Sequence, residues 1–209
     1  MSAQLCIVDY GVGNRRSVEK AFEKVGAQVV ISADPNVIES ADGLVLPGVG
    51  SFPSAMKRIR ELGQDQAIIA AAGRDTPILG TCLGMQVLLE RSGEHGGADG
   101  LGLVAGEVLA LDAGGAKLPH IGWSNVQWST PSPLTAGLGE AASFYHVHSF
   151  VTVPGDPDVV VGWSTYGSRF ASVIAKGNIY GVQFHPEKSS ADGLQMLANF
   201  CAICESQSR

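Results

Sequence analysis

The stretch PILGTCLGMQVLLERS, residues 77–92, joins an apolar run typical of a buried strand directly to the spacing of an amphipathic helix. Between the two lies Gly80-Thr81-Cys82-Leu83-Gly84, in which two glycines flank a cysteine. Side chains at the flanking positions would clash in a tight turn, so glycine is needed there. Strand, glycine-flanked nucleophile and helix in this order predict a nucleophile elbow that presents Cys82 at the end of a sheet. A turn that serves packing alone is the competing interpretation.

The first half of the chain repeats the pattern of strand followed by helix. The predicted strands are 5–10, 28–31, 43–46 and 77–82, and the predicted helices are 17–25, 53–72 and 83–92. This alternation predicts an α/β fold with a mostly parallel central sheet and flanking helices. Ligands of such sheets bind beyond the carboxyl ends of the strands, where Gly11-Val12-Gly13-Asn14 and Pro47-Gly48-Val49-Gly50 lie.

The second half of the chain changes to short alternating apolar runs. We predict strands at 103–111, 125–128, 143–150, 159–163, 171–175 and 179–184, followed by a closing helix over 191–205. Such runs indicate a mixed, mostly antiparallel region of sheet. A length of 209 residues with 45% hydrophobic residues suits one sizeable core. No repeat or linker divides the chain, so we expect a single domain spanning 1–209.

Charge and composition exclude several classes of protein. The formal net charge is −6, and the basic residues are scattered singly, which argues against a nucleic-acid or anionic-membrane partner and favours a small polar substrate. We see no secretory signal and no apolar run long enough to span a bilayer. The 4 cysteines are too few for a disulfide scaffold. We therefore expect a cytoplasmic protein whose cysteines are thiols, with Cys201 and Cys204 packed in the core rather than binding metal or reacting with oxidants.

A second motif supplies partners for the cysteine. Gly181-Val182-Gln183-Phe184-His185-Pro186-Glu187 places an imidazole and a carboxylate just beyond a strand-like run, and residues two apart in extended chain point the same way. His185 is suited to take the proton of Cys82, and Glu187 to orient the ring and stabilise its cation. A surface histidine with a chance acidic neighbour is the alternative for an isolated motif. Together, the two motifs predict a nucleophile that cleaves an amide.

Other local signals support or exclude further chemistry. The two glycines of Pro47-Gly48-Val49-Gly50 permit a backbone flip that would aim an N–H at developing negative charge, although a plain loop is the other interpretation. Gly11-Val12-Gly13 lacks the third glycine of a dinucleotide fingerprint, and no phosphate-binding loop is present. His146 and His148 have no evident third metal ligand. We therefore expect no cofactor and no metal.

Taken together, the motifs around Cys82 and His185 resemble the signature of class I glutamine amidotransferases. Four further segments resemble the glutaminase subunits of imidazole glycerol phosphate synthase, so that the resemblance runs almost end to end. They are Asp9-Tyr10-Gly11-Val12-Gly13-Asn14, Leu46-Pro47-Gly48-Val49-Gly50, Pro119-His120-Ile121-Gly122-Trp123 and Val147-His148-Ser149-Phe150. The chain departs from that pattern at Ser124, where Asn is common, and at Phe150, where Tyr is usual.

The resemblance implies a flavodoxin-like fold, glutamine as substrate and a (β/α)8-barrel cyclase as partner in a heterodimer. The cyclase would use the ammonia to form imidazole glycerol phosphate and aminoimidazole carboxamide ribotide in histidine biosynthesis. The site residues are implied by position. Cys82, His185 and Glu187 would form the catalytic triad, with backbone N–H groups of Val49 and Leu83 as the oxyanion hole; Gly50, Gln86, Glu94, His148, Ser149 and Phe150 would bind glutamine; and Asn14, Trp123, Tyr145 and Lys188 would face the cyclase and its ammonia passage.

Two other functions compete with this interpretation. One is a stand-alone cysteine hydrolase or the glutaminase of vitamin B6 synthesis, against which the Pro119 to Trp123 segment counts. The other is a catalytically dead binding module that keeps the fold, against which the intact Cys82, His185 and Glu187 set counts.

Overall fold

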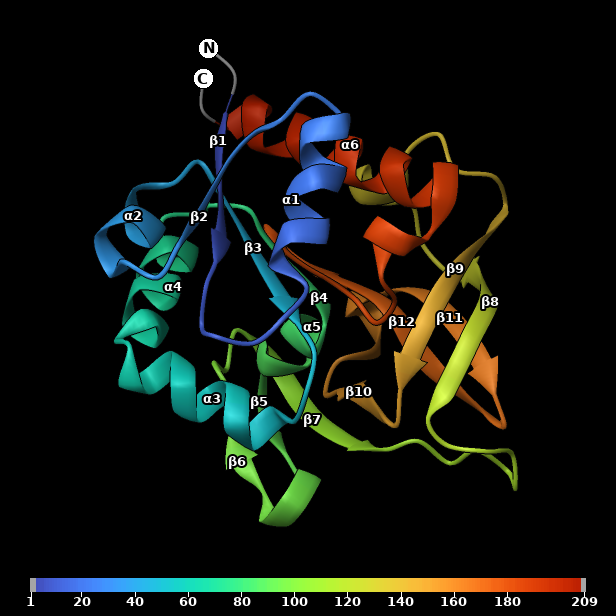
Figure 1. Ribbon diagram of the computed structural model, residues 1–209. Helices are drawn as coiled ribbons and strands as arrows, with labels where there is room; N and C mark the ends of the chain where they lie inside the picture. The colour runs from blue at the N-terminus through green and yellow to red at the C-terminus, as the bar shows by residue number, and fades with distance from the viewer. Residues whose placement is uncertain (1–2, 208–209) are drawn as a thin grey trace.

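One large mixed sheet runs through the protein. The computed structural model describes residues 3–207, and the main path of its sheet has the order β2-β1-β3-β4-β13-β12-β10-β7-β5-β6 (Figure 1). From β12 the sheet also branches through β11 and β8 to β9. The strands are β1 (Gln4–Val8), β2 (Gln28–Ser32), β3 (Gly43–Gly48), β4 (Ile78–Cys82), β5 (Leu89–Ser92), β6 (Ala98–Asp99), β7 (Val104–Ala110), β8 (His120–Trp128), β9 (Ala141–His148), β10 (Phe150–Pro154), β11 (Val160–Tyr166), β12 (Ser168–Lys176) and β13 (Ile179–Val182).

The five strands from β2 to β13 are all parallel, in the 2-1-3-4-5 spatial order of flavodoxin-like sheets. The predicted α/β fold with a parallel central sheet is confirmed. The last of these strands, β13, pairs parallel with β4 on one side and antiparallel with β12 on the other. Because Val182 pairs with Thr81, the chain that leaves β13 toward His185 emerges beside Cys82 at the end of β4.

Alternate side chains of the parallel strands build two cores on opposite faces of the sheet. In β1, Leu5 and Ile7 pack into the core that receives α1 and α6, while Cys6 and Val8 pack into the core that receives α3 and α4. Figure 1 shows α1 and α6 together on one side of the sheet and α2, α3 and α4 on the other. This double covering explains why the parallel strands are apolar on both faces.

Six α-helices complete the fold of residues 3–207. They are α1 (Arg15–Lys24), α2 (Pro35–Ser40), α3 (Phe52–Glu61), α4 (Gln64–Gly73), α5 (Leu83–Val87) and α6 (Ser190–Gln207), and single 3-10 turns lie at Glu94–Gly96, Pro133–Thr135, Pro157–Val159 and Pro186–Lys188. Helix α2 was not predicted, although Asp34 accepts a hydrogen bond from Asn36 N and Pro35 occupies the first turn, both of which are signals of a helix start. No helix within residues 3–207 has the length and apolar character needed to cross a bilayer.

Two predicted helices differ from the structure. The helix expected over 53–72 is two helices, because Gly63 adopts φ of 67° and turns the chain between α3 and α4. The helix expected over 83–92 ends at Val87, and the chain re-enters the sheet as β5, which lies beside β7. Leu101 N and Leu103 N donate to the carbonyls of Val87 and Leu88, so a later segment satisfies the groups that a longer helix would have used.

The strand expected over 143–150 is divided in two. β9 pairs with β8 in the branch of the sheet, whereas β10 pairs with β7 in the main path. Ser149, between His148 and Phe150, makes the crossing from one to the other, and its carbonyl accepts from Leu111 N. The break between β9 and β10 places the backbone at Ser149 in the same pocket as Cys82, the last residue of β4.

Candidate active site

Cys82 sits on a strained turn between β4 and α5. Its backbone has φ of 53° and ψ of −113°, a conformation that costs free energy for a non-glycine residue. A Cβ on Gly84 would lie 1.7 Å from the carbonyl oxygen of Leu46, and one on Gly80 would lie 2.4 Å from the carbonyl oxygen of Gly84. The glycines therefore let the turn press against β3, and the Cys82 thiol is held at the carboxyl end of the sheet.

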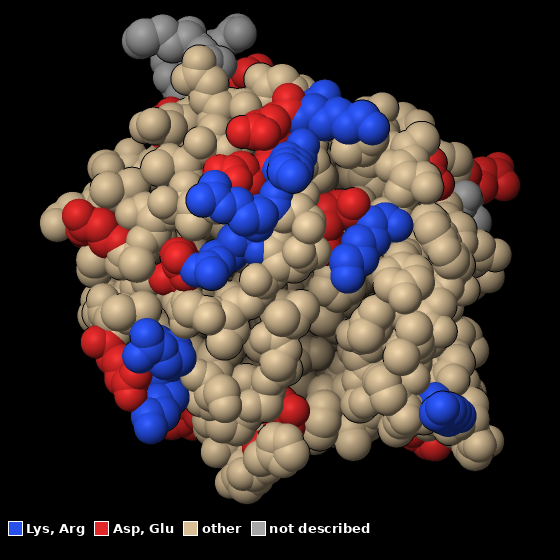
Figure 2. Space-filling view, in the orientation of Figure 1, with Lys and Arg blue, Asp and Glu red and all other residues tan. Residues whose placement is uncertain are grey.

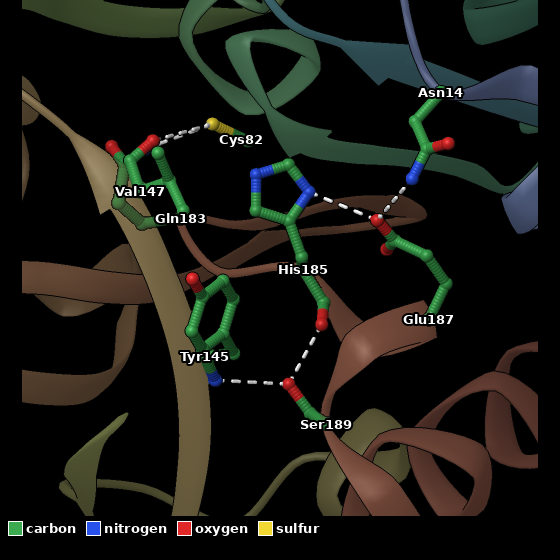
Figure 3. Close-up of polar contacts among 8 residues, drawn as sticks. All are labelled: Asn14, Cys82, Tyr145, Val147, Gln183, His185, Glu187 and Ser189. Carbon is green, nitrogen blue, oxygen red and sulfur yellow. Dashed lines mark hydrogen bonds and ion pairs between the residues drawn. The ribbon is translucent and has the colours of Figure 1, made fainter. Parts of the chain in front are cut away.

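His185 and Glu187 are held beside this turn by the chain that leaves β13 (Figure 3). His185 Nδ1 lies 3.0 Å from Glu187 Oε1, and the two side chains are only 4% and 1% exposed. His185 N donates to the carbonyl of Tyr145, and the Ser189 hydroxyl donates to the carbonyl of His185. Tyr145 N donates in turn to the Ser189 hydroxyl. Tyr145 of β9 thus holds the N–H of His185 directly and the carbonyl of His185 through the Ser189 hydroxyl.

The charges of the site favour a protonated His185. Burial by itself lowers the pKa of His185, but interactions with Cys82 and with Glu187 outweigh it and raise the pKa to about 9. Burial by itself raises the pKa of Glu187. The hydrogen bonds that Glu187 accepts from His185 and Asn14 outweigh this effect and hold its pKa below the usual value. An imidazolium facing a carboxylate on one side and a sulfur on the other is the arrangement of an activated cysteine.

Asn14 is bonded to this pair. Its Nδ2 donates to Glu187 Oε1 at 3.1 Å (Figure 3), from the segment that leads into α1. The sequence resemblance assigned Asn14 to the partner face and gave no contact with Glu187. The other carboxylate oxygen, Glu187 Oε2, is buried and accepts no hydrogen bond from the described residues. Asn14 and His185 together therefore orient the carboxylate through a single oxygen.

The thiol of Cys82 is turned toward β9 and β13. Its sulfur donates to the carbonyl of Val147 at 3.7 Å and accepts from Gln183 Nε2 at 3.9 Å (Figure 3). Gln86 Nε2 donates to Gln183 Oε1 at 3.3 Å. No role of its own was predicted for Gln183. Its place two residues before His185, on the same side of extended chain, is the signal that could have found it.

A pocket of about 430 Å³ opens in front of Cys82. It brings together the residues that the resemblance assigned to the oxyanion hole and to substrate, and they are Val49, Leu83, Gly50, Gln86, Glu94, His148, Ser149 and Phe150. His185 and Lys188 also line it. A small cavity with one carboxylate, one carboxamide and exposed backbone beside a cysteine suits a small zwitterionic substrate.

Glu94 connects this pocket to the start of α3. Its Oε2 accepts a hydrogen bond from Phe52 N, the first residue of α3, at 2.7 Å, and its Oε1 lies 3.7 Å from His95 Nε2. A carboxylate is favoured at a helix N-terminus because the first N–H groups there have no partner within the helix. Since residues 47–51 lead directly into α3, the carboxylate touches both the pocket and the end of the glycine-rich segment.

Tyr10 anchors the other end of that segment. Its side chain is fully buried, and its hydroxyl donates to the carbonyl of Pro47. Burial raises the pKa of Tyr10, and the nearby Cys82 adds to the effect. Val49, two residues after Pro47, remains 42% exposed at the mouth of the pocket. No role was predicted for Tyr10, because nothing local indicates a contact that spans 37 positions.

Of the residues expected at the partner face, Lys188 lines the pocket, whereas Trp123 lies on β8 and Tyr145 on β9. Trp123 is 52% exposed on β8, and its ring meets that of half-buried Tyr145 edge to face at 6.1 Å. Ile121, on the same side of β8, is 60% exposed, and Lys188 is exposed as well. Figure 2 shows Lys and Arg gathered in a band over α1, so the basic residues are not scattered singly as expected from the sequence, whereas the surface over β8 and β9 carries few charges. Large apolar side chains exposed on a weakly charged surface are common at protein interfaces.

Three histidines cluster behind the pocket without forming a metal site. His120 stacks on His146 with ring centres 5.1 Å apart, and His148 lies edge to face with His120 at 5.0 Å. Each ring nitrogen of the three has a hydrogen-bond partner, and these are the Ser124 and Ser172 hydroxyls, the Phe144 and Phe150 carbonyls, and the pairing of His120 with His148. Within residues 3–207 no group of three His, Cys, Asp or Glu side chains is arranged to hold a metal ion.

Sequence comparison with known proteins shows the family of the chain. The family model "Glutamine amidotransferase class-I" matches residues 6–204. The chain is 46% identical over 196 residues to the imidazole glycerol phosphate synthase subunit HisH of Moorella thermoacetica, covering 94% of this chain and 93% of that protein. It is 46% identical over 209 residues to subunit HisH 1 of Pseudomonas aeruginosa, covering 97% and 98%.

Solved structures share the fold at lower identity. A crystal structure of a glutamine amidotransferase has a TM-score of 0.76 at 17% identity, covering 96% of this chain and 98% of that one. PurLQS from Thermotoga maritima has a TM-score of 0.77 at 21% identity, covering 97% and 99%. The chain therefore belongs to the class-I glutamine amidotransferase family, and within it to the imidazole glycerol phosphate synthase subunits HisH.

Proposed function

We propose that this chain hydrolyses L-glutamine to glutamate and ammonia with Cys82, His185 and Glu187, and delivers the ammonia to a cyclase subunit. One observation supports it above the others. The buried His185–Glu187 pair, 3.0 Å between nitrogen and oxygen, stands beside a cysteine on a strained elbow at the mouth of a small polar pocket. Family membership makes a dead binding module a poorer description of the same residues.

The proposed reaction has two halves. Cys82 gives its thiol proton to His185, its sulfur attacks the carboxamide carbon of glutamine, and the C–N bond breaks as His185 passes that proton to the departing ammonia. Water then attacks the thioester, His185 takes a proton from it, and glutamate leaves with the thiol restored. The backbone N–H of Leu83 at the start of α5, and that of Val49 after a flip of its peptide, would stabilise the oxyanion.

Substrate recognition rests on the pocket walls. Glu94 would pair with the α-ammonium of the substrate glutamine, and Gln86 would form a hydrogen bond with the same substrate. The backbone of Gly50 and of residues 148–150 would fix its remaining polar groups. Glu94 also accepts from Phe52 N, so an ammonium that competes for this carboxylate would act on the segment that contains Val49.

The proposed partner is a (β/α)8-barrel cyclase in a heterodimer, in histidine biosynthesis in the cytoplasm, without nucleic acid or membrane. The relatives are named as subunits, which supports a partner. The exposed Ile121 and Trp123 on a weakly charged surface would form the contact, with Tyr145, Lys188 and Asn14 beside it. The cyclase would form imidazole glycerol phosphate and aminoimidazole carboxamide ribotide from the ammonia.

The test is co-purification with the cyclase encoded in the same genome, followed by two assays. We expect little glutamine hydrolysis by the isolated chain and a rise of at least ~100-fold when the cyclase holds its substrate, since one oxyanion donor contributes about that much. Release of glutamate is measured with and without the partner. Full activity of the isolated chain, unchanged by the cyclase, would contradict the dependence on a partner and favour a stand-alone hydrolase.

The activity of the complex is expected to fall at alkaline pH. The pKa of His185 lies at about 9, so the proton needed by the departing ammonia is present below that pH and is lost as the pH rises through it. Glu187→Gln removes the charge that favours this proton, and we expect the alkaline limb of kcat/KM to move down by about one to two pH units. Glu107→Gln, in an exposed ion pair with Arg91, serves as control and should leave the limb in place. An unshifted limb in Glu187→Gln would contradict the prediction.

A further inference from the structure

A continuous line of hydrogen bonds leads from β8 through two buried histidines to the wall of the pocket. The Ser124 hydroxyl lies 3.0 Å from His120 Nε2, four residues earlier on the same face of β8. His120 Nδ1 lies 3.1 Å from His148 Nε2. His148 Nδ1 lies 3.1 Å from the carbonyl oxygen of Phe150, which lines the pocket.

The protons of this line can be arranged in only one way. The Phe150 carbonyl only accepts, so the neutral His148 ring must carry its proton on Nδ1. His148 Nε2 then accepts from His120 Nδ1–H, and His120 Nε2 accepts from the Ser124 hydroxyl. Burial lowers the pKa of His120, and burial together with the neighbouring rings lowers the pKa of His148 to about 3. Both rings therefore stay neutral and keep these tautomers.

The Phe150 carbonyl is also tied to the substrate pocket from its other side. It accepts a second hydrogen bond from Gln86 Nε2 at 3.0 Å, so both of its lone pairs are in use. Gln86 also donates to Gln183, whose amide contacts the Cys82 sulfur. The orientation of Gln86 therefore depends on a carbonyl whose other donor is His148.

Packing holds the central ring of the line in place. His120 is stacked between Tyr166, with ring centres 4.1 Å apart, and His146, at 5.1 Å. His146 makes its own hydrogen bonds to the Phe144 carbonyl and the Ser172 hydroxyl, outside the line. A ring fixed on both faces can direct its nitrogens accurately, as the supporting residues of a binding site must.

We propose that Ser124 and His120 are positioning residues for substrate: through His148 they hold the Phe150 carbonyl and Gln86 in the arrangement that receives glutamine. The inference rests on the proposed function for the identity of that substrate. Ser124 and His120 are not among the described residues that line the pocket, so they act through His148 and do not touch the ligand.

The test compares Ser124→Ala and His120→Phe in the complex with the cyclase. Phenylalanine keeps a ring between Tyr166 and His146 but has no nitrogen. We expect the KM for glutamine to rise about five-fold in Ser124→Ala and about ten-fold in His120→Phe, the loss expected for one or two hydrogen bonds. The kcat and the synthesis from added ammonium salts should not change. Ser124→Thr, which keeps the hydroxyl, should restore the wild-type KM.

Two further measurements decide between positioning and simple packing. Ser172→Ala removes the hydroxyl that bonds His146 in the same cluster but leaves the line intact, and it should not alter KM. An equal rise of KM in Ser172→Ala, or an unchanged KM in His120→Phe, would overturn the proposal. Nitrogen-15 NMR of the isolated chain should show neutral Nδ1–H tautomers for His120 and His148. An Nε2–H tautomer on His148 would refute this line of hydrogen bonds, whether or not the complex hydrolyses glutamine. A wild-type complex that hydrolysed no glutamine would instead refute the proposed function.

Discussion

Cys82→Ala will abolish glutamine-dependent synthesis by the complex while leaving synthesis from added ammonium salts intact. Alanine provides no sulfur to form the thioester, and no other thiol lines the described part of the pocket. Removal of a nucleophile costs at least about 10³-fold in kcat, because the other members of the triad act only through it. Product formation with glutamine and with ammonium salts, measured side by side on the purified complex, provides the two readouts.

The control for this variant is Cys201→Ala. Cys201 is a half-buried thiol on α6, and burial raises its pKa to about 12, so it is not a reactive thiolate at neutral pH. Both activities should survive its replacement. Loss of both activities in Cys82→Ala would show that Cys82 supports the assembly itself, and retention of the glutamine-dependent activity would exclude it as nucleophile.

Gly84→Ala will destabilise the protein more than any surface substitution. The new methyl group would lie 1.7 Å from the carbonyl oxygen of Leu46, and that oxygen belongs to β3 and cannot rotate away. β3 and the elbow would have to separate, which costs about 3 kcal/mol or more in the free energy of unfolding. Urea unfolding followed by circular dichroism measures the loss, and failure to express as soluble protein is its extreme form.

Gly73→Ala is the matched control. Gly73 ends α4, and a methyl group there meets no heavy atom within 4 Å. Alanine is the better helix former, so we expect unchanged stability or a gain of up to about 1 kcal/mol. If Gly84→Ala unfolded at the same urea concentration as the wild type, the prediction that the elbow packs too closely against β3 for a side chain would be contradicted.

The local pattern of apolar residues predicted the elements of the parallel half of the fold well and those of the other half less well. The apolar runs that became β1 and β3 are buried on both faces of the sheet, and short apolar runs between turn residues are typical of such strands. The helix expected over 83–92 failed because its second half has helical spacing but pairs with β7, a strand later in the chain. A contact with a distant segment overrode a local preference.

The sequence by itself located the three residues to which we assign the chemistry. The glycines at positions 80 and 84, together with the two-residue spacing of His185 and Glu187, act over a few bonds, so they can be interpreted without any tertiary structure. They locate the elbow and the pair that stands beside it, and they made the family resemblance visible.

Only the tertiary structure decided what supports that chemistry. Asn14 meets Glu187 across 173 positions, Glu94 meets Phe52 across 42, and His120 meets His148 across 28. Each contact depends on how separate elements pack and in which register their strands pair, and neither is encoded in the periodicity of one segment. A side chain such as Asn14 has the same local signature whether it faces a partner protein or a buried carboxylate, and only the folded chain brings that carboxylate to it.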